Sequence, residues 1–295
     1  MKILLALDGS EPSGLARDLV ANLAWPAGTS VHLLAAYRPS IDYTGGVGSA
    51  MVWVGQIEDA IRDHLSETLT TMGAPLTARG LPVEQSVVRG RAGDVILETA
   101  RDIGADLVVT GSRGRGAVRS MLLGSVAAEV AASSPCPVLI ARGTSVSRLL
   151  VATDGSPNAA MIPGLIGAWE AFNGMPANVV SVVPDDPAGF DVLVALHTLG
   201  DDRLEHQRRE EALAAERTAN EMAARLTEQS IPATAHARSG DPANEILEAQ
   251  AELQSDLIVT GSRGLGGLER LVLGSVARNV LISAPCSVLI IRSDT

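Results

Sequence analysis

The 295-residue chain is poor in several residue types, and each shortage excludes a class of function. Aromatic residues make up only 2% of it, which argues against single-stranded nucleic acid as a ligand, because such proteins stack bases on aromatic side chains. The net charge of −11 disfavours DNA, RNA and anionic membranes as main partners. No apolar run approaches the roughly 20 residues of a membrane-spanning helix.

Cysteine and histidine are also too sparse to suggest a metal or redox centre. Cys136 and Cys286 cannot build a disulfide framework and form no Cys-x-x-Cys motif. Each of them precedes an apolar run, which predicts a buried thiol at the start of a strand. The five histidines show no ligand spacing. The apolar stretch before Asp8 is too short for a signal peptide, so we expect a cytoplasmic protein.

One sequence unit occurs twice in the chain. The copies lie about 150 positions apart, which indicates duplicated domains, because solenoid repeats are only about 20–50 residues long. We predict domains over residues 1–143 and 148–295. The matching segments are Leu5–Ser10 with Val151–Ser156, Gly111–Gly114 with Gly261–Gly264, Gly124–Ser125 with Gly274–Ser275, and Val138–Ile140 with Val288–Ile290.

Within each unit, short apolar runs alternate with longer helical patterns. Because the strands are apolar without alternation and are separated by helices, they predict an open α/β fold with a parallel sheet covered on both faces. We expect strands near 2–8, 30–37, 83–89, 106–110 and 137–142, and again near 148–153, 177–183, 232–238, 256–260 and 287–292. Helices are expected near 12–24, 52–72, 93–103 and 121–133, and near 157–172, 201–229, 243–253 and 271–283. Stretches 38–50 and 184–200 are expected to form flaps beside the sheet's carboxyl edge.

Glycines at fixed spacing follow the fourth strand of each unit and predict a phosphate site. Glycine permits positive φ and removes the Cβ that would keep a ligand away, and the unpaired amides at a helix start attract anions. Ser125 and Ser275 either cap the following helices or donate a hydroxyl to a phosphate. Arg113 and Arg263 either add positive charge to the site or face solvent.

Familiar phosphate motifs do not fit these loops. A Walker A loop needs a lysine after its last glycine, and the only lysine in the chain is Lys2. The dinucleotide fingerprint that starts at Gly114 or Gly264 has Arg119 or Glu269 in place of its last glycine. The loops therefore belong to another kind of phosphate site.

Asp8 and Asp154 each end the first strand of their unit, directly before Gly-Ser. One interpretation is that they cap the next helix. The other follows from the sheet: if strand four lies beside strand one, each aspartate and its glycine loop meet at the carboxyl edge, where open α/β sheets bind ligands. There a carboxylate could hold Mg²⁺ or a ribose hydroxyl.

The glycine spacing, with Asp-Gly-Ser after the first strand, closely resembles the universal stress protein family in its tandem-domain, ATP-binding form. Leu-Leu-Gly-Ser-Val and Pro-Cys-Pro-Val-Leu-Ile follow in the same order, and the match covers nearly the whole chain. The resemblance implies a five-stranded parallel sheet of order 3-2-1-4-5 in each domain. It also implies an internal pseudo-twofold contact through Val138–Ala141 and Val288–Ile291, and leaves a homodimer open.

Carried over by motif, the resemblance implies one adenine-nucleotide site per domain. Asp8 and Asp154 would face the nucleotide, and the main chain near Ala36 and Val182 would contact the adenine edge. Ribose and phosphates would be held by Gly111, Gly114, Gly124 and Ser125, and by Gly261, Gly264, Gly274 and Ser275. The first loop contains Arg115 and Arg119 where the second has Leu265 and Glu269, so we expect weaker binding at the second site.

Three functions are compatible with this sequence. The first is an ATP-binding regulator of a stress response, in which the nucleotide changes a surface that an unknown protein partner contacts. ATP, AMP or another adenine nucleotide could serve. The second is a slow Mg²⁺-dependent ATPase or phosphotransferase that uses Asp8 or Asp154. The third is an interaction module that needs no nucleotide.

Overall fold

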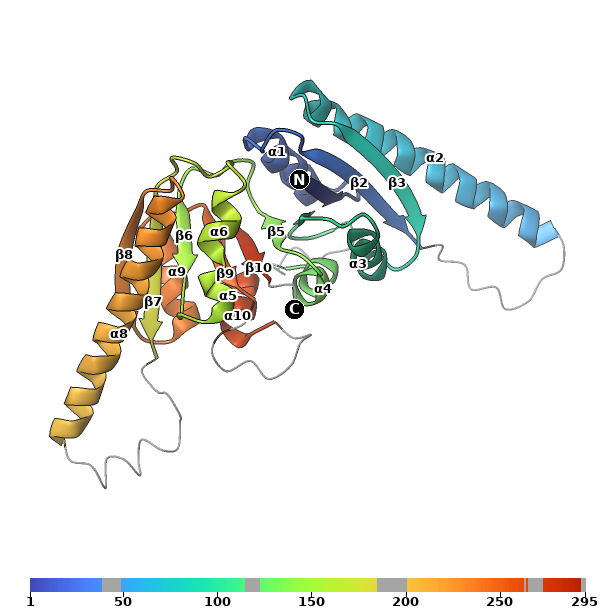
Figure 1. Cartoon of the computed structure of the whole chain (residues 1–295). Helices are drawn as coiled ribbons and strands as arrows, with labels where there is room; N and C mark the ends of the chain where they lie inside the picture. Colours follow the sequence, from blue (N-terminus) through green and yellow to red (C-terminus); the bar gives the residue numbers. More distant parts are fainter. Residues whose placement is uncertain (39–48, 115–122, 185–200, 263, 265–272, 293–295) are drawn as a thin grey trace. The chain divides into compact units, whose positions relative to one another are not determined.

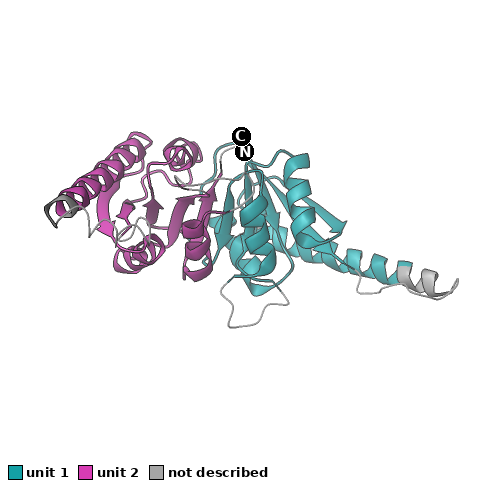
Figure 2. Ribbon diagram, turned by 90° about the horizontal axis from the view of Figure 1, so that it is seen from below, with its two compact units in different colours: residues 1–145, 294 teal, residues 146–293, 295 magenta. Residues whose placement is uncertain are grey.

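The chain divides into two compact units, Met1–Ser145 and Val146–Ser293 (Figure 2). The computed structural model describes residues 1–38, 49–114, 123–184, 201–262, 264 and 273–292. Both stretches predicted as flaps fall almost wholly outside the described residues. No helix in the described ranges is long and apolar enough to cross a membrane.

The first unit contains five parallel strands in the order β3-β2-β1-β4-β5, which is the predicted order. Strands β2 and β3 lie side by side in Figure 1. Helices α1 and α2 contact each other on one face of this sheet, and α3 and α4 contact each other on the other. Its elements are β1 (Lys2–Ala6), α1 (Glu11–Asn22), β2 (Ser30–Tyr37), α2 (Ser49–Ala78), β3 (Val83–Arg89), α3 (Ala92–Asp102), β4 (Leu107–Gly111), α4 (Ser125–Ser133) and β5 (Val138–Ala141).

The second unit repeats this topology in the order β8-β7-β6-β9-β10, again with parallel neighbours. The predicted open α/β fold is therefore confirmed for both halves. Its elements are β6 (Leu149–Ala152), α5 (Pro157–Ala160), α6 (Ile162–Gly167), β7 (Ala177–Val183), α8 (Asp201–Glu228), β8 (Ala233–Ser239), α9 (Pro242–Glu252), β9 (Leu257–Gly261), α10 (Ser275–Ser283) and β10 (Ser287–Ile291).

The central strands explain why the sequence does not alternate between polar and apolar residues. All of Ile3–Leu5 in β1 and Leu107–Val109 in β4 are 0% exposed, because helices cover both faces of the sheet. The outer strand β3 keeps exposed positions at Glu84 and Gln85, as expected of a sheet edge. The unit cores therefore lie along the middle strands, which hold the site at their carboxyl ends.

Four predicted helices have clearly different bounds in the structure. The helix expected over 157–172 is two short helices, α5 and α6, because Pro163 has no amide to continue a helix and is tolerated only in a first turn. The helices expected from residues 121 and 271 begin at Ser125 and Ser275, directly after the N-cap residues Gly124 and Gly274. Helix α2 continues past residue 72 to Ala78 and accommodates Pro75.

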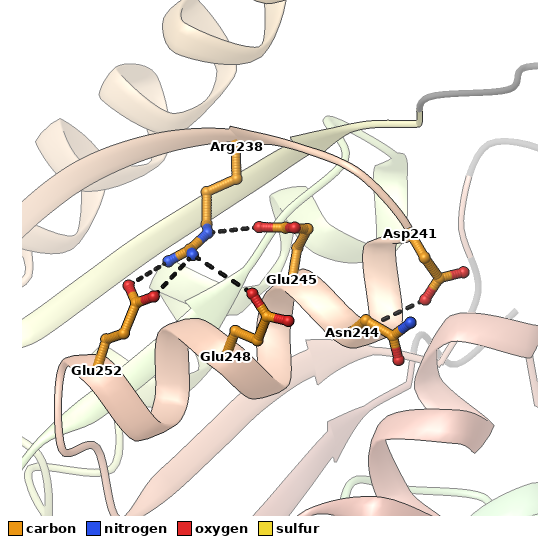
Figure 3. A network of polar contacts seen from close by, with 6 residues as sticks. All are labelled: Arg238, Asp241, Asn244, Glu245, Glu248 and Glu252. Carbon is orange, nitrogen blue, oxygen red and sulfur yellow. Dashed lines mark hydrogen bonds and ion pairs between the residues drawn. The ribbon is translucent and has the colours of Figure 1, made fainter.

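An ion-pair network joins the outer strand β8 to α9 (Figure 3). The Arg238 guanidinium donates to Glu245 at 2.7 Å and to Glu252 at 2.8 and 3.1 Å, and Glu248 lies 4.0 Å away. Arg238 holds the pKa of the Glu252 carboxyl below its usual value, through a hydrogen bond and its charge. Asp241 caps α9 by accepting from the Asn244 amide at 2.9 Å. This network fixes the sheet edge of the second unit.

Candidate functional site

Strand register brings the predicted residues to one edge of each sheet. In the first unit, Ala6 pairs with Leu34 on β2 and with Thr110 on β4. Two residues further along, Asp8 and Ala36 lie at the carboxyl edge beside the start of the glycine loop. Ala152 pairs in the same way with Val180 and Thr260, which places Asp154 and Val182 at the matching edge of the second unit.

Asp8 organises the turn that leads into α1. Its Oδ1 accepts from the Ser10 amide at 3.0 Å and from the Ser10 hydroxyl at 2.6 Å, while Gly9 adopts a φ of 75° that favours glycine. The cap of α1 is Ser10, whose hydroxyl accepts from the Ser13 amide at 3.4 Å. The interpretation of Asp8 as the helix cap is therefore wrong, since it holds the residue that caps.

The second unit contains the same turn. The Oδ1 of Asp154 accepts from the Ser156 amide at 3.0 Å, and Gly155 has a φ of 74°. Ser156 caps α5 by accepting from the Ala159 amide at 3.3 Å. In both units the aspartate is oriented through Oδ1 by the residue two positions further on.

The glycine loops are closed at their bases by equivalent hydrogen bonds. The Gly124 amide donates to the Ser112 carbonyl at 2.7 Å, and the Gly274 amide donates to the Ser262 carbonyl at 2.8 Å. These glycines are the N-cap residues of α4 and α10, and no side chain caps either helix. Ser125 and Ser275 are thus the first helical residues and not caps. Their hydroxyls are exposed, so the role that stays open to them is hydrogen bonding to a phosphate.

Glycine is needed at positions 111 and 114 because a Cβ would collide with neighbouring atoms, and not because the backbone adopts a positive φ. A Cβ on Gly111 would lie 2.5 Å from the Pro12 backbone, and one on Gly114 would lie 2.7 Å from Asp8 Oδ2. Neither residue is among those with positive φ. In the second unit, a Cβ on Gly264 would lie 2.5 Å from Asp154 Oδ2. Both loops therefore bring their backbone against the carboxylate that ends the first strand.

A cavity of about 430 Å³ opens between Asp8, the glycine loop and the start of α4. This volume is within the range of small-molecule sites, about 300–1,000 Å³. The predicted residues that line it are Asp8, Ala36, Gly111, Arg113, Gly114, Gly124 and Ser125. The apolar wall of the cavity includes Leu34, Ala92, Ile96 and Leu123, whose pattern in the sequence does not differ from that of core residues.

The electrostatics of this cavity favour an anion near α4. The half-buried side chain of Arg113 lines the cavity beside the uncapped amides of the helix. Arg263 lies outside the described residues, as do Arg115, Arg119, Leu265 and Glu269. Within the described ranges, no group of three or more His, Cys, Asp or Glu side chains could hold a metal ion.

Comparison with known proteins matches both halves of the chain to the same family. The universal stress protein family model matches residues 1–142 and again 146–292. A universal stress protein of Thermus aquaticus is 35% identical over 141 residues, which cover 48% of this chain and 97% of the relative. One of Mycolicibacterium smegmatis is 27% identical over 285 residues, which cover 92% and 83% of the two chains.

A solved structure matches the whole chain in fold. The universal stress protein from Archaeoglobus fulgidus DSM 4304 aligns with a TM-score of 0.66 over 99% of this chain and 96% of its own, at 20% identity. The fold therefore agrees across both units, and the family model accounts for each half separately. The chain belongs to the universal stress protein family and carries two of its domains in tandem.

Proposed function

We propose that this protein is a cytoplasmic regulator of a stress response that binds one adenine nucleotide, ATP in the first instance, in each domain. The observation that carries the proposal is the approach of Gly114 to Asp8 beside the uncapped start of α4. It joins a carboxylate suited to ribose hydroxyls with amides suited to phosphate oxygens in one cavity. The membership of the chain in the universal stress protein family supports the same ligand.

In this proposal each part of the first site has its own role. The amides at Gly124 and Ser125, with the Ser125 hydroxyl and Arg113, bind the phosphates. Asp8 binds the ribose, and the main chain at Ala36 meets the adenine edge. Gly111 and Gly114 let the loop approach closely. Asp8 would be the residue that holds a Mg²⁺ accompanying the nucleotide.

The second domain would bind through the corresponding residues. They are Asp154, Val182, Gly261, Arg263, Gly264, Gly274 and Ser275. Asp154 is more exposed than Asp8, so a ligand there is less shielded from water. We propose that occupancy of the two sites changes a surface read by a protein partner, and that the two domains pair through their last strands.

Nucleotide released from freshly purified, denatured protein tests the proposal directly. We expect an adenine nucleotide, and we expect calorimetric titration of nucleotide-free protein with ATP to show two sites. Steady production of ADP that disappears in Asp8→Asn would instead favour the ATPase. A protein that carries no nucleotide and binds none would contradict the proposal.

A further inference from the structure

An ion-pair cluster joins the start of α3 to α4 beside the cavity of the first unit. The Arg91 guanidinium donates to both carboxylate oxygens of Asp94, at 2.9 and 3.3 Å, and also to the Glu129 carboxylate. Ala92, the next residue along the chain, lines the cavity together with the first turn of α4. We call Arg91, Asp94 and Glu129 the α3 cluster, and its arginine has no role so far in binding ribose, phosphate or base.

Glu129 lies directly against the start of α3. A Cβ on Gly93 would collide with the Glu129 carboxylate, so the glycine leaves room for this side chain. The N-cap residue of α3 is Arg91, whose side chain has no acceptor for the unpaired amides of the first turn. Glu129 therefore balances two positive groups, the Arg91 guanidinium and the amino-terminal end of α3.

The α3 cluster is within reach of the phosphate site proposed at the start of α4. Ser125 is the first residue of α4 and Glu129 follows four residues later, so their side chains are neighbours on one face of the helix, with about 5–6 Å between the Cβ atoms. The side chain of Arg91 is 55% exposed where it meets Glu129. A change of rotamer can therefore carry its guanidinium from Glu129 toward Ser125.

We propose that Arg91 binds the outermost phosphate of a nucleoside triphosphate in the first domain, in exchange for its contact with Glu129. This inference rests on the proposed function. A guanidinium pairs with phosphate oxygens through the same two-pronged geometry that it uses for carboxylates. A nucleoside monophosphate has only the phosphate that the start of α4 already holds, and has none left for Arg91. Arg91 thus makes the first domain selective for ATP over AMP.

The second domain lacks this cluster. At the separation that relates the two glycine loops, Asp241 stands in place of Arg91, and Asn244 and Asn279 replace the two acids. The Asp241 carboxylate is fixed at the start of α9, because it accepts from the Asn244 amide at 2.9 Å. Where the first domain offers a movable cation, the second therefore has a fixed negative charge. We expect the second domain to distinguish less between ATP and AMP.

Arg91→Met tests this assignment by calorimetric titration of the full chain with ATP and, separately, with AMP. Loss of a hydrogen bond between charged groups should weaken ATP binding about tenfold or more at the site that Gly114→Ala also weakens. AMP binding should stay within about twofold of the parent, because AMP does not reach Arg91. The matched control is Arg101→Met, which removes the same charge from the exposed last turn of α3 and should alter neither ligand.

Glu129→Gln gives a second test with the opposite sign. It releases Arg91 from a surface ion pair, so ATP affinity at the first site should rise about threefold while AMP affinity changes little. Most of this gain should be lost in the double variant Arg91→Met/Glu129→Gln, because the gain requires the arginine. A gain of the same size with and without Arg91 would contradict the exchange.

The outcomes separate this inference from the proposed function. Equal weakening of ATP and AMP in Arg91→Met would show that the cluster only ties α3 to α4, and would overturn the inference. Unchanged ATP affinity in Arg91→Met would overturn it as well, while Gly114→Ala that still weakens binding would leave the proposed function in place. No binding of ATP by the parent chain would overturn the proposed function and this inference together.

Discussion

Replacement of Gly114 by alanine tests the geometry of the first site most sharply. The new Cβ would lie 2.7 Å from Asp8 Oδ2, whereas ordinary contacts of a Cβ begin at 3.4 Å. The carboxylate cannot withdraw freely, because Oδ1 accepts two hydrogen bonds from Ser10 at 3.0 and 2.6 Å. Either the loop moves away from Asp8 or Asp8 gives up part of its contact with Ser10.

Both responses separate the groups that are proposed to bind ribose and phosphate. A hydrogen bond to a charged group contributes about 1.5–3 kcal/mol, so losing one such contact corresponds to about 10- to 150-fold weaker binding of ATP at this site. The fold should survive, because Gly114 is exposed three residues beyond the end of β4 and its φ is not positive.

Calorimetric titration of Gly114→Ala with ATP measures this loss, and Gly14→Ala is the matched control. A Cβ on Gly14 in α1 would meet nothing within 4 Å, so the control should keep full ATP affinity. It should also gain some stability from the better helix propensity of alanine. A folded Gly114→Ala protein that binds ATP as tightly as the control would refute the reasoning.

Three further changes test other parts of the account. Gly264→Ala, whose Cβ would lie 2.5 Å from Asp154 Oδ2, should weaken ATP binding at the second site only, which a two-site titration resolves. Ser10→Ala should lower the free energy of unfolding, measured in urea, by about 1 kcal/mol through loss of the α1 cap. It should also weaken ATP binding, because Asp8 loses the hydrogen bond from the Ser10 hydroxyl. Intact ATP affinity would show that Asp8 does not need this hydrogen bond. Arg238→Met should lower the urea midpoint at pH 7. Because the pKa of Glu252 is lowered in the folded protein, its ion pair with Arg238 stabilises the fold above the ordinary carboxyl pKa. This stabilisation is lost as pH falls through the pKa of Glu252 in the folded protein, so the urea midpoints of parent and variant should converge in acid. A constant difference between the two midpoints down to pH 3 would contradict this.

The sequence was sufficient for the sheet and for the residues at its edge. Apolar strands without alternation define a covered parallel sheet, and the position of Asp8 after the first strand follows once β4 lies beside β1. The local chemistry of turns was harder to predict. The N-cap residues of α1 and α4 are Ser10 and Gly124, whereas Asp8 and Ser125 were the candidates. The N-cap position is set by backbone angles, and the sequence does not show which of several neighbouring residues adopts them.

The cavity lined by Tyr37, Ile57 and Ile61 beside α2 could not be predicted for a different reason. The pattern of α2 identifies a buried stripe, but not how far the helix extends beyond the ends of the strands. Only the packing of α2 on β2 and β3 places Ile57 and Ile61 above the sheet edge, next to Tyr37. Similarly, the division of the expected helix 157–172 depended on Pro163, whose effect on a helix depends on its position within it.

The central claim is that each domain holds an adenine nucleotide at its aspartate and glycine loop. The most direct test is the number of ATP molecules bound per chain, measured by calorimetric titration of the nucleotide-free protein, alone and with Gly114→Ala or Gly264→Ala. We expect two sites in the parent chain, with the tighter one weakened by the first substitution and the weaker one by the second. An absence of ATP binding, or two sites that neither substitution affects, would contradict it.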